Sequence, residues 1–179
     1  MMAEDVTLKV VNDSENRQVL IYGMGDQHLE VVASKLAERY KVGITLETPK
    51  VAFRETIRKN SDVDTKYKKQ SGGHGQYGHV KMRFEPSGDL ETPYVFEEEV
   101  VGGAVPKNYF PAVEKGLQDS VVKGPLAGYP VVGVKATLYD GSYHPVDSSE
   151  MAFKTATCQA FKKGIMEAGP VLLEPIASV

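Results

Sequence analysis

The sequence contains little cysteine and no long apolar run, and each shortage excludes a class of protein. Cys158 is the one cysteine among 179 residues, which excludes an internal disulfide framework and is typical of a reducing compartment. No apolar stretch reaches the roughly 20 residues that a membrane-spanning helix needs, and the N-terminus lacks the apolar core of a signal peptide. We therefore expect a cytoplasmic protein that has no membrane partner.

Signatures of catalysis are also scarce. Three histidines, His74, His79 and His144, and two acids, Asp140 and Asp147, lie in or beside two polar loops, but no pair has the spacing of zinc ligands on one element. No serine or cysteine occupies a nucleophile elbow. The glycine-rich segment around His74 lacks the Lys-Ser/Thr ending of a nucleoside-triphosphate loop, and no helix pattern follows it directly. A small metal-dependent hydrolase therefore remains only an alternative.

The glycine-rich segment at residues 68–80 is the most distinctive stretch that the sequence does contain. Glycine permits backbone conformations that side chains forbid, so we expect a bent, exposed loop here. The formal net charge of the chain is -3, yet residues 58–83 carry seven cations and two acids, a local charge of +5. Such a basic segment can bind phosphate groups although the whole chain is acidic. A solvated strand face would have a similar composition and remains the alternative.

The first part of the chain combines short strand patterns with one helix pattern. We predict a hairpin of strands at 6–11 and 18–22, a helix from Asp26 to about Tyr40, a strand at 44–47 and an extended segment at 51–58. These elements are few for an independent core, so we expect a domain at residues 1–58 that is incomplete or supported by its neighbour.

The second part begins near Asn60 and has longer elements. Strand patterns at 62–70 and 80–84 flank the glycine-rich segment and predict a long hairpin with that loop at its end. Further along we predict strands at 94–100 and 130–139, helices at 106–122 and from about 147 to 168, and an extended end at 171–179. Asp147 and Glu150 have the spacing of a helix cap and its reciprocal partner.

Eight motifs cover nearly the whole chain. They are GMGDQHLE from Gly23, VAFRETIR from Val51, QSGGHGQYG from Gln70, VGGAVPK from Val101, LAGYPV from Leu126, DGSYH from Asp140, DSSEMAFK from Asp147 and VLLEPI from Val171. In this order and spacing they closely resemble the bacterial elongation factor G family of translocation GTPases.

The resemblance implies an α+β chain of two domains. Residues 1–58 are similar to the later part of the family's third domain, a partial ferredoxin-like α/β sandwich whose first strand and helix are missing here. Residues 59–170 are similar to the fourth domain, whose fold is like domain 2 of ribosomal protein S5 and includes an unusual left-handed βαβ crossover. Residues 171–179 would start the link to an absent fifth domain.

The resemblance also implies a site. In this family the fourth domain projects into the decoding centre of the small ribosomal subunit and helps transfer RNA and messenger RNA to move together. The matching tip loops are residues 71–78 and 140–146, and Lys66, Lys68 and Lys69 would contact ribosomal RNA phosphates. The implied contacts to transfer, messenger or ribosomal RNA are Ser71, Gly72, Gly73, His74, Gly75, Gln76, Tyr77, Asp140, Gly141, Ser142, Tyr143 and His144.

The catalytic part of such a factor would lie elsewhere. GTP and Mg²⁺ belong to an N-terminal domain of the parent protein that is absent here. We therefore expect no catalytic residue, cofactor or metal ion in this chain and no enzyme activity of its own. The expected partners are the ribosome, transfer RNA and messenger RNA, and we expect a monomer.

Departures from the family pattern leave alternatives open. Asp26-Gln27 stands where Glu-Leu is common, His74 where arginine is frequent, and Pro145 where an acid is common. These departures suggest a specialised paralogue rather than the main housekeeping factor. A ribosomal protection protein that removes tetracycline is the nearest alternative, but the retained GGHGQYG and DGSYH motifs favour translocation.

Overall fold

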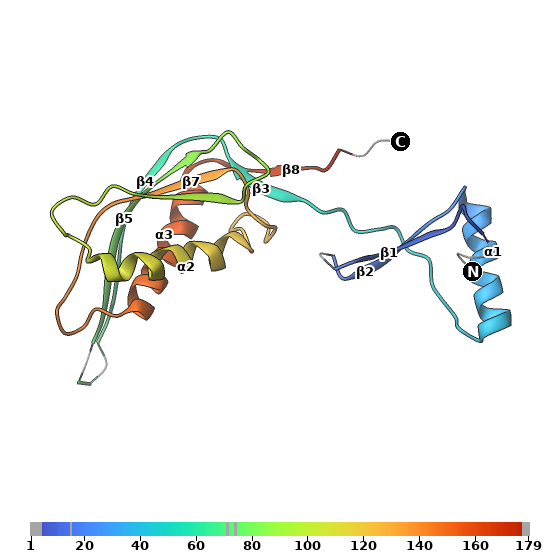
Figure 1. Cartoon of the computed structure of the whole chain (residues 1–179), viewed down its shortest axis with the longest axis horizontal. Helices are drawn as coiled ribbons and strands as arrows, with labels where there is room; N and C mark the ends of the chain where they lie inside the picture. Colours follow the sequence, from blue (N-terminus) through green and yellow to red (C-terminus); the bar gives the residue numbers. More distant parts are fainter. Residues whose placement is uncertain (1–4, 15, 71, 74, 177–179) are drawn as a thin grey trace. The chain divides into compact units, whose positions relative to one another are not determined.

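The computed structural model describes residues 5–14, 16–70, 72–73 and 75–176, and these form two compact units (Figure 1). One unit extends to Ala52 and includes Pro175 and Ile176, and the other comprises Phe53–Glu174. The division falls before the strand Arg54–Ile57 (β3), which we expected in the first domain. No helix in the described ranges has the length and apolar character of a membrane-spanning segment.

The first unit consists of a two-stranded hairpin and one helix. β1 (Lys9–Asp13) pairs antiparallel with β2 (Gln18–Tyr22), and α1 covers Asp26–Tyr40. The hairpin and the helix are confirmed, but the predicted strand at 44–47 is wrong, since that segment has no strand conformation. Instead, the side-chain amide of Gln18 bonds the carbonyl and the N–H of Lys50, both at 2.9 Å, so a side chain holds this connection.

A four-stranded sheet is the centre of the second unit. Its order is β4 (Ser61–Lys69), β5 (Gln76–Pro86), β7 (Val134–Ser142) and β6 (Tyr94–Glu98). β4, β5 and β7 pair antiparallel, whereas β6 and β7 are parallel neighbours. The chain passes from β6 to β7 through a helix, which gives the expected βαβ unit, and its left-handed sense stays a prediction.

Two helices cover one face of this sheet. α2 (Phe110–Val121) follows a short 3₁₀ turn at Lys107–Tyr109, and α3 covers Glu150–Glu167 (Figure 1). The expected cap at Asp147 is wrong, because the Ser149 side chain accepts the hydrogen bond from the N–H of Ala152. Side chains of alternate strand residues fill the layer between sheet and helices, as Val80, Met82 and Phe84 of β5 do. The largest fully buried side chains include Phe84, Phe153, Phe161, Met82 and Leu117.

The end of the second unit opposite the hairpin loop is closed by a second small sheet. β3 pairs antiparallel with β8 (Pro170–Leu173). Glu55 of β3 is fully buried, and its carboxylate accepts backbone hydrogen bonds from Leu126 at 3.1 Å, Ala127 at 2.8 Å and Tyr129 at 3.1 Å. A buried charge needs such partners, so the Leu126–Tyr129 turn is fixed to β3.

The other face of the sheet carries polar side chains, and no helix in the described part of the second unit covers it. A β-bulge shifts the β5–β7 register between Lys81 and Met82, so Met82 pairs with Leu138 and Lys81 pairs with Asp140. The extra residue, Tyr139, reverses the alternation beyond it. Asp140 and Ser142 therefore lie on the open face, although simple alternation from buried Leu138 would turn both toward the helices.

Candidate nucleic-acid interface

The first candidate loop closes the β4–β5 hairpin. Its flanking residues Lys69 and Gln76 are paired, and the hairpin extends beyond the helices (Figure 1). Gly72 and Gly73 have φ angles of 52° and 102°, which side chains rarely adopt. A Cβ atom at either position would meet nothing within 4 Å, so backbone conformation rather than packing requires these glycines. Ser71 and His74 lie outside the described residues.

The second candidate loop leads from β7 into α3. We expected the loop to begin at Asp140. β7 instead continues through Ser142, so Asp140 and Gly141 are strand residues. Past the strand, the loop is organised around His144. Its ring Nδ1 lies 3.3 Å from the N–H of Val146 and 3.2 Å from the N–H of Asp147, both of which donate to it. The backbone N–H of His144 itself donates to the Ser148 hydroxyl at 2.8 Å.

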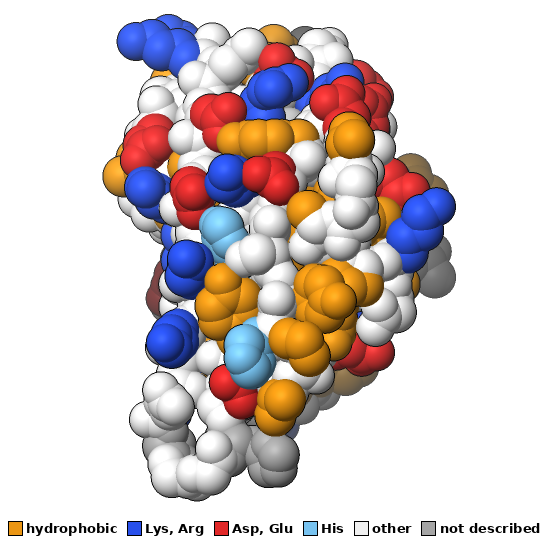
Figure 2. Space-filling view, turned by 90° about the vertical axis from the view of Figure 1, so that its left-hand side faces the viewer, with side chains coloured by type: hydrophobic (Ala, Val, Ile, Leu, Met, Phe, Trp, Pro, Cys, Tyr) orange, Lys and Arg blue, Asp and Glu red, His pale blue; other side chains and the backbone are white. Residues whose placement is uncertain are grey.

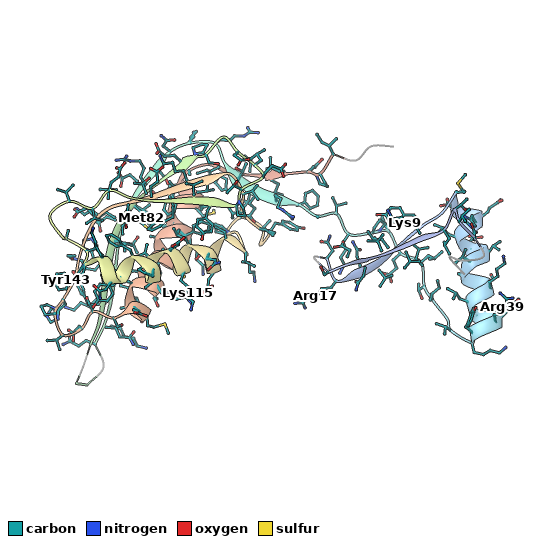
Figure 3. The ribbon with its side chains drawn as sticks, viewed as in Figure 1. Lys9, Arg17, Arg39, Met82, Lys115 and Tyr143 are labelled. Atoms are coloured by element: carbon teal, nitrogen blue, oxygen red, sulfur yellow. The ribbon has the colours of Figure 1, made fainter. Side chains whose placement is uncertain are left out.

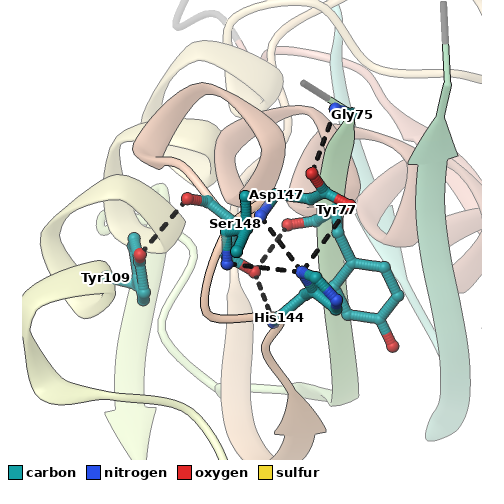
Figure 4. A network of polar contacts seen from close by, with 7 residues as sticks. Gly75, Tyr77, Tyr109, His144, Asp147 and Ser148 are labelled. Carbon is teal, nitrogen blue, oxygen red and sulfur yellow. Dashed lines mark hydrogen bonds and ion pairs between the residues drawn. The ribbon is translucent and has the colours of Figure 1, made fainter. Parts of the chain in front are cut away.

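Asp147 and Ser148 join the two loops (Figure 4). The Asp147 carboxylate accepts from the N–H of Gly75 at 3.0 Å, and its backbone carbonyl accepts from the N–H of Tyr77 at 2.8 Å. The Ser148 hydroxyl donates to the carbonyl of Tyr77 at 2.9 Å. We refer to the described residues of both loops together with the adjoining strand ends, 72–73, 75–77 and 142–148, as the joint tip.

The joint tip exposes aromatic and imidazole rings. The side chain of His144 is 51% exposed, and its ring centroid lies 6.3 Å from that of Tyr77, with the planes tilted by 55°. Tyr143, the residue before His144, is 46% exposed and lies near the hairpin end of the second unit (Figure 3). Exposed rings of this kind can stack on bases or bond riboses.

Cations lie on the hairpin strands next to the joint tip. Lys66, Lys68 and Lys69 are exposed residues at the end of β4, and no ion pair involves them within the described part of the chain. In Figure 2, basic side chains lie along the left edge of the view, and most acidic side chains lie farther from the hairpin end. These lysines are therefore accessible from solvent, and their contact with RNA phosphates stays a prediction.

Lys81 differs from these lysines because it is paired. Its ammonium lies 2.9 Å from the Asp140 carboxylate across the β5–β7 ladder. The hydrogen bond from Lys81 is the main reason why the pKa of Asp140 lies below its ordinary value. The same bond raises the pKa of Lys81. Asp140, an expected RNA contact, is thus engaged within the sheet.

His79 and Asp64 are polar residues of the open face that the sequence did not place in the site. His79 is buried, with Nε2 2.8 Å from the Asp64 carboxylate and Nδ1 2.7 Å from the Ser142 hydroxyl. The Ser142 oxygen also lies 2.7 Å from the hydroxyl of Tyr77. From the alternation of β5, the sequence could have predicted that His79 shares a face with Lys81 and Tyr77. It could not have predicted the contact with Ser142, because that contact depends on a bulge that the sequence does not reveal. Among the described residues, no group of three or more His, Cys, Asp or Glu could hold a metal ion.

Comparison with known protein families gives the context of this geometry. A family model described as domain IV of elongation factor G matches residues 49–169, and one described as domain III matches residues 1–48. The chain belongs to the elongation factor G family. This confirms the family resemblance that the eight motifs indicated.

Individual relatives of this elongation factor G segment agree. Elongation factor G of Fervidobacterium nodosum is 49% identical over all 179 residues, which cover 26% of that protein. A crystal structure of a Thermus thermophilus protein has a TM-score of 0.77 and 46% identity, covering 96% of this chain and 25% of the other. The chain thus spans about a quarter of the length of these relatives. The similarity also confirms the α+β fold class.

Proposed function

We propose that this segment is the ribosome-contacting arm of an elongation factor G in the cytoplasm. In this proposal, the joint tip enters the decoding centre during GTP-dependent movement of transfer RNA and messenger RNA. The observation that carries the proposal is the fastening of both loops to one another by Asp147 and Ser148. A rigid tip can push or hold an RNA duplex, whereas two independent loops would yield.

The chemistry of the joint tip suits RNA of any sequence. Because Nδ1 of His144 accepts from backbone amides, the neutral ring carries its proton on Nε2, which leaves that nitrogen as a hydrogen-bond donor. A donor of this kind can bond ribose or phosphate oxygens, and the adjacent lysines add charge attraction. Contacts to backbone groups carry no direct sequence information, which is what a factor that moves every codon needs.

The proposal assigns the chemical step to another part of the parent protein. GTP and Mg²⁺ would be bound by a nucleotide-binding domain outside this chain. The segment would then contribute binding and positioning without hydrolysing GTP. Turnover of GTP by the purified segment above background would contradict this division of labour.

Salt dependence of ribosome binding tests the RNA contact. Each lysine that neutralises a phosphate contributes roughly 0.7–0.9 to the slope of log affinity against log salt concentration. We expect the double variant Lys68→Glu and Lys69→Glu in the full-length factor to weaken binding and to flatten this slope. Lys115→Glu is the matched control, because Lys115 is an exposed lysine on α2, away from the hairpin. An unchanged slope in the double variant would contradict contact at the end of β4.

A further inference from the structure

Four side chains from three strands form a continuous hydrogen-bonded row on the open face of the sheet. Asp64 lies on β4, His79 and Tyr77 on β5, and Ser142 on β7. In order, the contacts are Asp64 to His79 at 2.8 Å, His79 to Ser142 at 2.7 Å and Ser142 to Tyr77 at 2.7 Å. We call this row the His79 relay. It connects an interior histidine to a ring of the joint tip.

When the His79 ring is neutral, the chemistry of the groups fixes the direction of each hydrogen bond. A carboxylate can only accept, so Nε2 of His79 must carry the proton that bonds Asp64. The Nδ1 atom of the neutral ring is then an acceptor, and the Ser142 hydroxyl must donate to it. The Ser142 oxygen has given its one proton, so it accepts the proton of the Tyr77 hydroxyl.

Three further features favour a fixed relay. The side chain of His79 is only 10% exposed, so a ring nitrogen without a partner would be costly. The β-bulge at Tyr139 places Ser142 opposite His79 on the open face. Gly141, on the opposite face, would bring a Cβ within 2.3 Å of the His79 carbonyl. The backbone is thus closely fitted where the relay crosses from β5 to β7.

We propose that His79 is a positioning residue for the joint tip. Because His79 accepts the proton of Ser142, the Ser142 oxygen accepts the hydroxyl proton of Tyr77, and that proton is then used within the protein. The oxygen of Tyr77 is then free only to accept, beside the Nε2–H donor of His144. At these two rings the joint tip therefore offers RNA one acceptor and one donor, and Tyr77 meets an RNA hydrogen-bond donor rather than a phosphate oxygen. The part of this inference that concerns RNA rests on the function proposed above.

Protonation of His79 would reverse the relay. A charged ring donates from both nitrogens, so the Ser142 proton would have to turn toward Tyr77 or water. The groups that act on this equilibrium are Asp64 and Lys66 of β4, Lys81 of β5 and Asp140 of β7. Lys66 is paired with His79 in the β-ladder, and Asp64 is bonded directly to the ring.

The tautomer of His79 provides a test that does not involve the ribosome. We would label the full-length factor with ¹⁵N-histidine and assign the His79 ring by its loss in His79→Gln. At pH 7.5 we expect a proton on Nε2 and none on Nδ1. A ring with its proton on Nδ1, or one charged at that pH, would overturn the relay whatever the factor does on the ribosome.

A double-mutant cycle tests the link to Tyr77. We expect His79→Gln and Tyr77→Phe each to slow single-round translocation about fivefold, and the double variant to be no slower than either, because both break one row. His79→Asn retains an acceptor near the Nδ1 position and should slow the reaction less than His79→Gln. Independent effects, seen as a product of the two single reductions, would overturn the coupling.

The chain supplies a matched control and a second variant. Tyr139 donates to Asp62 on the same face but outside the relay, so Tyr139→Phe should leave the rate unchanged. Ser142→Ala keeps the histidine but breaks the same row. It should slow translocation as expected for His79→Gln, and it replaces that variant if His79→Gln does not fold. If the unmodified factor does not translocate, the proposed function fails. In that case two other measurements test the relay. They are the tautomer of His79 and the coupling between His79→Gln and Tyr77→Phe in their effects on thermal unfolding.

Discussion

The hydroxyl of Ser148 provides the sharpest test of how the joint tip is held together. It donates to the carbonyl of Tyr77 at 2.9 Å and accepts from the backbone N–H of His144 at 2.8 Å. One oxygen atom therefore joins the start of β5, next to the first loop, to His144 in the second loop. Ser148→Ala removes both bonds and leaves the rest of the chain unchanged.

The expected cost follows from these two contacts. A neutral hydrogen bond contributes about 1 kcal/mol, and the freed groups are near the surface, where water can replace part of each bond, so we expect a loss of about 1–2 kcal/mol in the free energy of unfolding. Urea unfolding of the variant measures this loss. Amide hydrogen exchange reports the local effect, and the His144 amide should exchange roughly tenfold faster.

Thr155→Ala is the matched control for this experiment. The Thr155 hydroxyl lies on the exposed side of α3 and bonds the carbonyl of Met151 one turn earlier, at 2.8 Å. Its removal should change the free energy of unfolding by less than about 0.5 kcal/mol, as is usual for surface substitutions. Equal effects of the two variants, or an unchanged exchange rate at His144, would refute the reasoning that Ser148 joins the loops.

Two further predictions concern charged groups. Glu55→Ala should lower the free energy of unfolding, measured with urea, by about 3–5 kcal/mol, because three backbone N–H groups lose a buried acceptor. Glu55→Gln keeps one oxygen and should lower it less. Equal losses in the two variants would contradict this account. The carboxyl of Asp140 should titrate by NMR below its ordinary pKa, and Lys81→Met should move that pKa upward. Since the folded-state pKa is lowered, the contribution of Asp140 to stability is present at neutral pH and is lost as the pH falls through the folded-state pKa; an unmoved pKa in Lys81→Met would show that another group causes the shift.

Local patterns in the sequence predicted most of the elements of the fold. The spacing of Leu29, Val32 and Leu36 predicted the helix at Asp26–Tyr40, and the structure has it with those bounds. The strand predicted at 44–47 is wrong. A strand needs a hydrogen-bonded neighbour as well as a suitable sequence, and none of the described strands pairs with that segment. The cap at Asp147 fails for a related reason: its carboxylate is already bonded to Gly75, a contact 72 residues away in sequence.

The candidate site was only partly accessible to sequence reasoning. Loop composition and family resemblance indicated both loops and the three lysines, and the RNA contacts assigned to these residues stay predictions. The sequence did not reveal the partners that hold the loops, Asp147, Ser148 and His79. Their positions depend on strand register, and a single bulged residue, Tyr139, decides whether Ser142 faces His79 or the helices. No pattern in β7 marks that residue.

The most direct test of the central claim is single-round translocation by the full-length factor with His144→Ala, followed in parallel with GTP hydrolysis. The control is Gln118→Ala, an exposed polar residue of α2. We expect translocation to slow while hydrolysis continues at the unmodified rate, because the joint tip acts on RNA and the nucleotide is bound elsewhere. Unchanged translocation in His144→Ala, or an equal slowing of both steps, would contradict the account.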